Sequence, residues 1–252
     1  MARRRRRSRP VRRDGKGGWL GFWLVLGGVF LFRTFLYQPF TIPSGSMQPG
    51  LLEGDYIIVS KAATGYGRHS AWPLPLPVSD RLKKSGPERG DVVVFRPEDV
   101  PRDVIKRVVA LPGDRIRMSE DTVFVNGEPI TVADARAPAV TVKEPRGAEV
   151  PAGLQIERAG DTDYATAQLD PAQSGFEELT VPEGYYFVLG DNRDRSGDSR
   201  LGVEAGGVGL VPSAGIVGEA KLVLLSVEDE FTLWKPWTWH RIRGDRWFTA
   251  IQ

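Results

Sequence analysis

The sequence predicts a mainly β protein, in which a single N-terminal transmembrane helix precedes an all-β domain with an inserted β-rich subdomain. Three observations lead to this fold class. An uncharged apolar stretch follows a basic N-terminus. Short β-branched or aromatic runs, separated by Pro and Gly, fill the rest of the chain, and no long segment beyond residue 38 has a helical period. With 252 residues, the chain can bury a substantial core.

The N-terminus is strongly basic. Residues 1–16 carry nine Arg and Lys residues and one Asp, a net charge of +8, whereas the other residues carry 25 basic and 31 acidic side chains, a net charge of −6. We expect residues 1–17 to form a basic cytoplasmic tail, because positive charge beside an apolar stretch stays in the cytoplasm. Arginine runs also bind nucleic acid, but this one is short and lacks interleaved aromatic residues. We therefore expect no nucleic-acid partner.

The apolar stretch runs from Trp19 to Phe32. With its flanking residues it predicts a transmembrane anchor over residues 18–37, in which Arg33 reaches the outer interface. A cleavable signal peptide is the alternative. No Ala-x-Ala pattern follows the stretch, which favours an uncleaved anchor with the N-terminus in the cytoplasm. The lipid bilayer is then one partner of the chain.

Beyond the anchor, six runs are typical of strands. They are residues 56–60, 91–95, 104–109, 122–125, 185–189 and 216–225. Asn126-Gly127 lies between strand-like residues and predicts a hairpin. Residues 65–89, rich in Gly, Pro and charge, predict a long loop. Residues 131–180 have weak strand signals and are expected to belong to the inserted subdomain.

The composition excludes several kinds of chemistry. The chain has no cysteine, which excludes disulfides, a cysteine nucleophile and cysteine-bound zinc. Its two histidines, His69 and His240, lie outside any HExxH run and are expected to be surface loop residues. The sequence therefore favours neither a histidine-based zinc site nor a Ser-His-Asp arrangement. We expect no metal and no cofactor.

Four segments contain residues that could carry chemistry. They are Pro43-Ser-Gly-Ser-Met47, Arg89-Gly-Asp-Val-Val-Val-Phe95, Ile105-Lys-Arg-Val-Val-Ala-Leu-Pro-Gly-Asp114 and Gly190-Asp-Asn-Arg-Asp-Arg-Ser-Gly-Asp-Ser-Arg200. Taken singly, each has an ordinary explanation as a loop, an exposed strand lysine or a turn. Because the four segments occur together and in this order, the chain resembles the type I signal peptidases. The resemblance covers the anchor and residues 35–61, 89–114, 185–200 and 211–226.

The resemblance implies a signal-peptidase-type catalytic domain with Ser46 as nucleophile and Lys106 as general base. The chemistry of the residues agrees, because a serine hydroxyl attacks efficiently only when a nearby base takes its proton. A lysine can be that base if burial lowers its pKa from about 10.4 by several units. The apolar neighbours of Lys106 suit this, and strand alternation predicts that Arg107 faces away from the site.

The resemblance also implies how the dyad is assisted. The Ser44 hydroxyl and the Ser46 backbone N–H are expected to form the oxyanion hole. Ser196 is expected to orient the lysine amine. Asp198 and Arg200 correspond to an ion pair that holds the wall of the site.

Ile42 and Ile105 correspond to residues that line the pockets for small substrate side chains. The resemblance further implies preprotein substrates with signal peptides, cut after small-x-small sites, and a functional link to the export translocase. It places the chain in the bacterial cytoplasmic membrane as a single-pass protein. The catalytic core, over residues 38–114 and 185–252, lies on the extracytoplasmic side, and residues 115–184 form an inserted cap subdomain.

The chain departs from the family pattern at Gln48, Arg195 and Gly197, which are positions that vary in the family, and in two longer segments. Residues 201–209, Leu-Gly-Val-Glu-Ala-Gly-Gly-Val-Gly, replace an expected aromatic residue and a shorter link, which puts the wall near Arg200 in doubt. Residues 131–180 have no counterpart that we can align. The dyad is unaffected by either departure.

Other functions compete with this interpretation. A self-cleaving Ser-Lys repressor would need a DNA-binding domain before Ser46. A penicillin-binding acyltransferase would need Ser-x-x-Lys, yet none of the eight lysines has a serine three residues earlier. A non-catalytic anchor or scaffold is a third alternative, and the intact Ser46 and Lys106 oppose it.

The C-terminal segment from Leu233 to Phe248 contains four tryptophans among arginines. Trp and Arg favour the membrane interface, so the segment could contact lipid. Packing of these aromatic side chains against the β-core is an equally weighted alternative.

Overall fold

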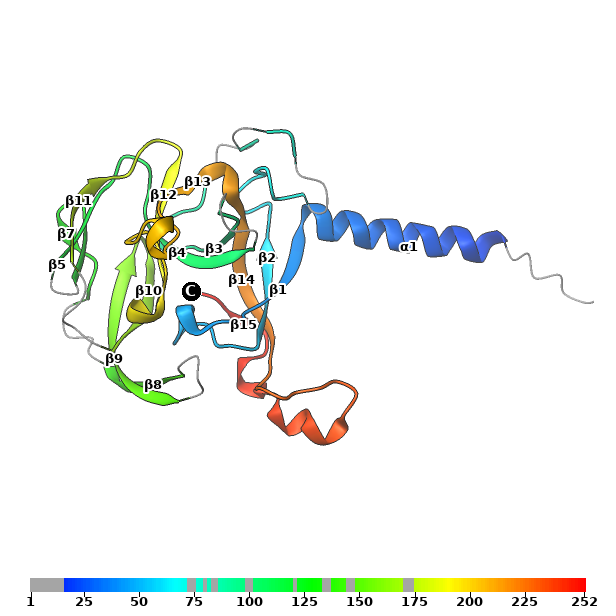
Figure 1. Cartoon of the computed structure of the whole chain (residues 1–252). Helices are drawn as coiled ribbons and strands as arrows, with labels where there is room; N and C mark the ends of the chain where they lie inside the picture. The colour runs from blue at the N-terminus through cyan, green and yellow to red at the C-terminus, as the bar shows by residue number, and fades with distance from the viewer. Residues whose placement is uncertain are drawn as a thin grey trace, which may run out of the picture.

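The structure is a computed structural model that describes residues 16–71, 76–78, 81–82, 86–97, 102–119, 122–132, 137–143, 148–169 and 175–252. The predicted basic tail lies outside these residues as far as residue 15, and so does much of the predicted loop over 65–89. Figure 1 shows one helix that projects from a body built of β-strands.

Helix α1, Lys16–Phe35, is the only α-helix among the described residues. It ends two residues before the predicted limit of the anchor, because Tyr37 already pairs with Ser60 in the sheet. The helix and the predicted anchor thus differ by two residues at that end, and the bounds of the anchor stay a prediction. By length and hydropathy together, no helix in the described part of the chain qualifies as a membrane span. Large apolar side chains are nevertheless exposed along α1, namely Trp19, Leu20, Phe22, Trp23, Leu24, Val25, Leu26, Val29, Phe30, Leu31 and Phe32.

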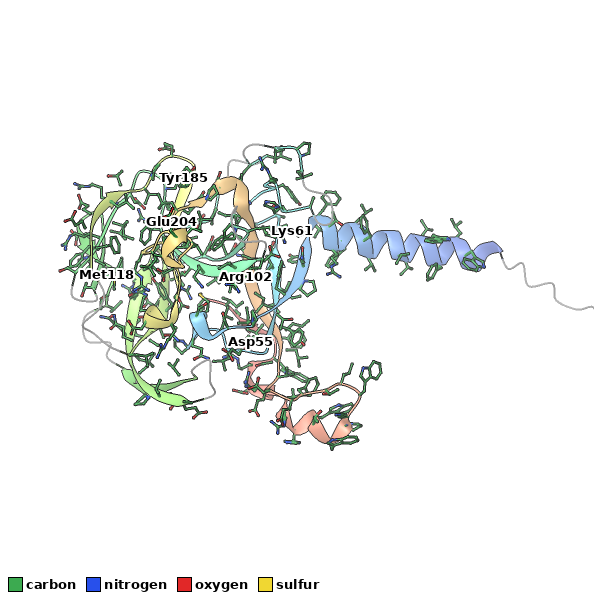
Figure 2. The ribbon with its side chains drawn as sticks, in the orientation of Figure 1. Asp55, Lys61, Arg102, Met118, Tyr185 and Glu204 are labelled. Carbon is green, nitrogen blue, oxygen red and sulfur yellow. The ribbon has the colours of Figure 1, made fainter. Side chains whose placement is uncertain are left out.

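The C-terminal end of α1 is bound to the body by two residues. The last carbonyl groups of a helix have no partner within it. Here the Lys61 amine donates to the carbonyl oxygens of Arg33 and Thr34, at 3.1 and 3.0 Å. The Tyr66 hydroxyl donates to Phe35, at 2.6 Å. Lys61 lies beside the inner end of α1, as Figure 2 shows, and its positive charge also suits the negative end of the helix dipole.

The body is organised around one antiparallel sheet. Its strands follow the order β1-β2-β14-β3-β4-β12-β13, and β15 pairs with β14. The strands are β1 Tyr37–Thr41, β2 Asp55–Ser60, β3 Val92–Phe95, β4 Val104–Ala110, β12 Tyr185–Leu189, β13 Val211–Pro212, β14 Ile216–Ser226 and β15 Thr249–Ala250. Strands from both ends of the chain therefore meet in the centre of the sheet.

The intervening strands form two smaller sheets. One has the order β11-β5-β6-β7 and the other the order β10-β9-β8. Their strands are β5 Arg115–Ser119, β6 Thr122–Val125, β7 Glu128–Pro129, β8 Ala137–Lys143, β9 Glu149–Ala159, β10 Thr162–Gln168 and β11 Phe176–Thr180. We call the sheet of β8, β9 and β10 the inserted sheet.

All six strand-like runs are confirmed as strands. The hairpin at Asn126-Gly127 is confirmed as well, because Val125 pairs with Glu128 and both turn residues have positive φ, 54° and 90°. This is the backbone that a two-residue turn of the I′ type requires. The described parts of residues 65–89 contain no helix or strand. Strands β1, β5 and β8–β11 were not predicted individually.

The core lies on both faces of the main sheet. In β3, Val92 and Val94 pack into one apolar cluster, whereas Val93 and Phe95 pack into another. Successive strand residues point to opposite faces, so a continuous Val-Val-Val-Phe run indicates a strand covered on both sides. A side chain on the adjacent β4 is therefore buried whichever face it takes.

The C-terminal segment leaves the body as a small lobe below α1 in the view of Figure 1. Its 3-10 turns are η5, Pro236–Arg241, and η6, Gly244–Arg246. Trp234 and Trp237 are 86% and 72% exposed. Packing of these two side chains against the β-core, one of the two predicted alternatives, is therefore wrong. His240 is exposed in the same lobe, and His69 is partly exposed in a loop, as expected.

Candidate active site

Ser46 lies in a tight turn directly after strand β1. The 3-10 turn η1, Gly45–Met47, places Ser46 and Met47 in the interior. Two backbone hydrogen bonds fix Ile42, which lies between β1 and this turn. The Ile42 N–H donates to the Asp55 carbonyl at 2.8 Å, and the Gly54 N–H donates to the Ile42 carbonyl at 3.0 Å. The Ser46 hydroxyl is thus held on a short, braced loop rather than on a free one.

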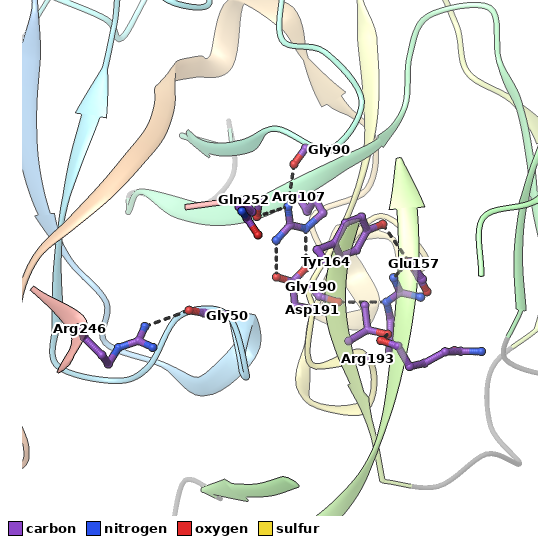
Figure 3. A network of polar contacts seen from close by, with 12 residues as sticks. Gly50, Gly90, Arg107, Glu157, Tyr164, Gly190, Asp191, Arg193, Arg246 and Gln252 are labelled. Carbon is purple, nitrogen blue, oxygen red and sulfur yellow. Dashed lines mark hydrogen bonds and ion pairs between the residues drawn. The ribbon is translucent and has the colours of Figure 1, made fainter. Parts of the chain in front are cut away.

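A second brace holds the chain just after this turn. Arg246 donates to the Gly50 carbonyl at 2.9 Å and forms an ion pair with the buried Asp55 at 2.6 Å. Figure 3 shows the first of these contacts. Asp55 also accepts from Leu52 N–H, at 2.8 Å. The C-terminal segment therefore stabilises the loop that carries Ser46.

Lys106 reaches Ser46 from the middle of β4. It pairs in the sheet with Val93, and its side chain is 4% exposed. The amine Nζ and Ser46 Oγ are hydrogen-bonded at 2.8 Å, and Nζ also donates to the Ile105 carbonyl at 3.0 Å. The two residues, sixty positions apart in the chain, are therefore within the range for proton transfer.

Burial lowers the pKa of Lys106 from 10.5 to about 8. The nearby Asp198 and Asp191 carboxylates raise this pKa, and the Arg102 guanidinium lowers it further. Burial dominates because the charged amine loses its hydration. A substantial fraction of the amine is then neutral in mildly alkaline solution, so it can accept a proton from the Ser46 hydroxyl.

Arg107 faces away from the dyad, as alternation along the strand predicts, but it does not reach solvent. It is bound by Asp191 through two contacts of 2.8 and 2.7 Å, and both side chains are almost fully buried. It also donates to the carbonyl oxygens of Gly90 and Gln252, each at 2.7 Å. Its charge is thereby neutralised inside the protein.

The loop after β12 closes the site from the other side. Asn192 N–H donates to the Ser46 carbonyl at 3.1 Å, and the Asn192 side-chain amide donates to the Gly45 carbonyl at 3.1 Å. A Cβ at Gly190 would lie 2.2 Å from Ser196 Oγ and 2.6 Å from the Ser46 carbonyl oxygen. Only glycine fits there, because a side chain would push these groups apart.

The predicted ion pair between Asp198 and Arg200 is present. Arg200 Nε and Nη2 contact the two carboxylate oxygens at 2.8 and 3.0 Å. Asp198 is fully buried and also accepts from Gly190 N–H at 3.1 Å. The pair therefore holds the turn of the loop beside the dyad.

The remaining predicted residues surround the dyad without a demonstrated role. Ser196 Oγ is buried and has no hydrogen-bond partner among the described residues, so its role toward the Lys106 amine stays a prediction. Ser44 is exposed at the start of the turn, and its side chain does not cap it. Ile42 and Ile105 are buried in one apolar cluster. Their assignments to the oxyanion hole and to substrate pockets stay predictions.

Sequence reasoning did not find two groups at this site. Asn192 and Asp191 belong to a recognised segment, yet nothing in the sequence shows that they hold the Ser46 loop and Arg107. Within the described ranges, no group of three or more His, Asp or Glu side chains is arranged to bind a metal ion. A hydroxyl hydrogen-bonded to a buried amine is an arrangement suited to nucleophilic acyl transfer.

Comparisons with known proteins agree with this chemistry. A family described as signal peptidase, peptidase S26, matches residues 18–225. Signal peptidase I of Pseudomonas fluorescens is 36% identical over 229 residues, which cover 86% of this chain and 71% of the relative. Signal peptidase I of Pseudomonas aeruginosa is 38% identical over 222 residues, which cover 82% and 72%.

One solved structure is also similar. It is a signal peptidase I from Enterococcus faecalis V583, with 32% identity over 53% of this chain and 95% of that chain, and a TM-score of 0.31. The assignment to a family therefore rests on the similarity in sequence.

Burial of Lys106 predicts a cost in stability that depends on pH. Below about pH 8 the amine is protonated in both the folded and the unfolded state, and the cost is complete. Between about pH 8 and 10.5 only the unfolded state keeps the proton, so the free energy of unfolding rises with pH. We expect Lys106→Met to be more stable than the parent protein at pH 7, by up to about 3 kcal/mol, with a gain that shrinks toward pH 10.

Urea unfolding at several pH values measures this gain. Lys235→Met is the control, because Lys235 is exposed in the C-terminal lobe. Its effect should be small and nearly independent of pH. A Lys106→Met variant that is less stable than the parent at pH 7 would contradict the prediction.

Proposed function

The chain belongs to the signal peptidase family, peptidase S26, and from this premise we propose that Ser46 is its nucleophile and Lys106 its general base. Its function is that of signal peptidase I, a serine endopeptidase that acts on preproteins bearing signal peptides. The 2.8 Å contact between a buried amine and a buried hydroxyl is the observation that supports the residue assignment.

The proposed reaction has two stages. The neutral Lys106 amine takes the Ser46 proton while Ser46 Oγ attacks the carbonyl carbon of the scissile peptide bond. The protonated amine then donates its proton to the leaving nitrogen, which breaks the C–N bond and leaves an acyl-enzyme. A water molecule, deprotonated by the same amine, then attacks the ester carbonyl carbon. The C–O bond to Ser46 breaks, the protonated amine returns the proton to Ser46 Oγ, and the signal peptide leaves with a new C-terminal carboxylate.

The remaining roles are proposed from the resemblance of the motifs to those of the family. The Ser44 hydroxyl and the Ser46 N–H would stabilise the oxyanion, and donors of this kind contribute about 3 kcal/mol each. Ser196 would orient the amine, and its place against Gly190 next to the Ser46 carbonyl supports this role. Ile42 and Ile105 would limit the substrate pockets to small side chains, which gives cleavage after small-x-small sites.

The finer topology is part of the proposal. Helix α1 would hold the chain in the bacterial cytoplasmic membrane with the basic tail in the cytoplasm. Its exposed apolar side chains support this, because an aqueous environment would leave them unburied. The catalytic core, residues 38–114 and 185–252, would face the extracytoplasmic side next to the export translocase, with residues 115–184 as the cap. Residues 115–180 supply only strands of the two smaller sheets, which supports this division.

Removal of either dyad residue should abolish cleavage. We expect Ser46→Ala and Lys106→Ala to lose essentially all activity on a preprotein with an Ala-x-Ala site, measured by gel in detergent or in liposomes. Each variant should retain the circular dichroism spectrum of the parent protein. Near-normal cleavage by either variant would show that the dyad is assigned wrongly.

The pH dependence of cleavage tests the base directly. Because only the neutral amine accepts a proton, kcat/KM should rise with pH through a midpoint near 8, the pKa of buried Lys106. Arg102 lowers this pKa, so Arg102→Gln should move the midpoint upward. A midpoint near 6.5, typical of histidine, would count against the proposed base.

The exposed tryptophans of the C-terminal lobe should bind lipid. For a protein reduced to residues 38–252, we expect Trp237→Ser with Trp239→Ser to weaken binding to anionic liposomes roughly tenfold in a flotation assay. Tyr185→Ser is the control, since this aromatic side chain is exposed on the body. Equal binding by both variants would exclude the lobe as an interfacial contact.

A further inference from the structure

The inserted sheet is bonded directly to the loop that closes the dyad. On β10, Ala167 N–H donates to the Asp191 carbonyl at 2.8 Å. Two residues further on, Leu169 N–H donates to the Asp194 carboxylate at 2.6 Å. Asp191 and Asp194 both belong to the loop after β12. The inserted sheet therefore contacts the catalytic loop through backbone as well as side chains.

Four charged side chains form a buried network at this contact, drawn in Figure 3. Arg107 pairs with Asp191, and Arg193 pairs with Glu157 of β9. All four side chains are at most 3% exposed. Two positive and two negative charges balance one another, as buried charges must to be tolerated. Glu157 is the only one of the four that the inserted sheet supplies.

Tyr164 of β10 links the two ion pairs. Its hydroxyl donates to Glu157 Oε2 at 2.8 Å, and its ring lies 4.0 Å from the Arg107 guanidinium carbon. Burial and the Glu157 carboxylate hold the pKa of Tyr164 well above its usual value, so the phenol stays protonated and donates a hydrogen bond. A cation over an aromatic face is a favourable contact. Tyr164 therefore contacts one member of each ion pair.

From this network the contacts continue to both dyad residues. Arg193, held by Glu157, donates to the Gly190 carbonyl at 3.2 Å within the catalytic loop. Asn192, between Asp191 and Arg193, donates from its backbone to the Ser46 carbonyl. Arg107 is the neighbour of Lys106 on β4. A displacement of the loop would therefore move Ser46 through the hydrogen bond from Asn192, and would move Lys106 through its chain neighbour Arg107.

We propose that Glu157, supported by Tyr164, is a positioning residue of the inserted sheet that sets the distance between Ser46 and Lys106. This proposal rests on the proposed function of the two dyad residues. Neither Glu157 nor Tyr164 touches the reacting atoms. Their effect on the reaction passes through Arg193, Asp191 and Asn192.

The energetic consequence of removing Glu157 distinguishes positioning from mere stabilisation. Arg193 would keep its charge in the interior without a counter-ion, and the loop would move to hydrate it. A displacement of about 1 Å in a catalytic group reduces the rate on the order of a hundredfold. The apolar cluster of Ile42 and Ile105 is not on this path. The chemical step should therefore suffer while substrate binding does not.

The experiment measures kcat and KM separately for the full-length protein in detergent, with a preprotein substrate. For Glu157→Gln we expect kcat to fall at least roughly tenfold and KM to stay within about twofold of the parent value. Tyr164→Phe keeps the ring over Arg107 and removes only the hydroxyl, so a smaller fall in kcat, of about threefold, is expected. All assays are run well below the melting temperature of each variant.

Arg158→Gln is the matched control. Arg158 is the next residue on β9, but its side chain is 57% exposed and pairs with Asp163 at the surface. Its kcat should equal that of the parent protein, because exposed ion pairs contribute little. A folded Glu157→Gln with a lower melting temperature but the parent kcat would overturn the proposal. If Glu157→Gln does not fold, Tyr164→Phe decides, and parent kcat there overturns it.

The result remains separate from the test of the dyad. If Ser46→Ala retained cleavage, the proposed function of Ser46 would fail, whatever Glu157→Gln did. If Ser46→Ala were inactive and Glu157→Gln kept the parent kcat, only the positioning role would fail.

Discussion

A lysine amine acts as a base near neutral pH only where its charged form is unfavourable. Lys106 is buried next to Ser46, so the groups around it must not stabilise the charged amine strongly. Carboxylates nearby work against it, since Asp198 and Asp191 both raise the pKa of Lys106. Each of them is paired with an arginine, Asp198 with Arg200 and Asp191 with Arg107. The ion pairs therefore let the loop carry acidic residues beside the dyad while most of their charge is offset.

Five of the eight strands of the main sheet, and the dyad, could be predicted from the sequence because their signals are local. Runs such as residues 91–95 are β-branched and apolar throughout, as strands covered on both faces must be. Ser46 and Lys106 were identified through their motifs, and the contact between them agrees with that identification. The strands of residues 131–180 gave only weak signals, since most positions of β9 and β11 are partly or fully exposed and few of them need an apolar residue.

Other features of the site could not be read from the sequence because they depend on distant segments. Alternation along β4 correctly turns Arg107 away from Lys106, but it cannot show that Asp191 and Tyr164 cover that face. Glu157 lies outside every motif, and its burial follows only from the folding of the inserted sheet onto the catalytic loop. Gly190 belongs to a motif, yet its need to lack a side chain becomes evident only when Ser46 and Ser196 are seen against it.

Lys61 shows why a lowered pKa alone does not identify a catalytic lysine. Its pKa is also lowered to about 8, by burial and by the charge of Arg33. Its amine donates hydrogen bonds to two carbonyl oxygens at the end of α1, which have no proton to give to a neutral amine. The Lys106 amine instead faces a hydroxyl, from which a neutral amine can take a proton and create a nucleophile. Both lysines have a pKa lowered by burial, but Lys61 stabilises the end of a helix whereas Lys106 can act as a base. The group to which each amine is hydrogen-bonded makes this difference.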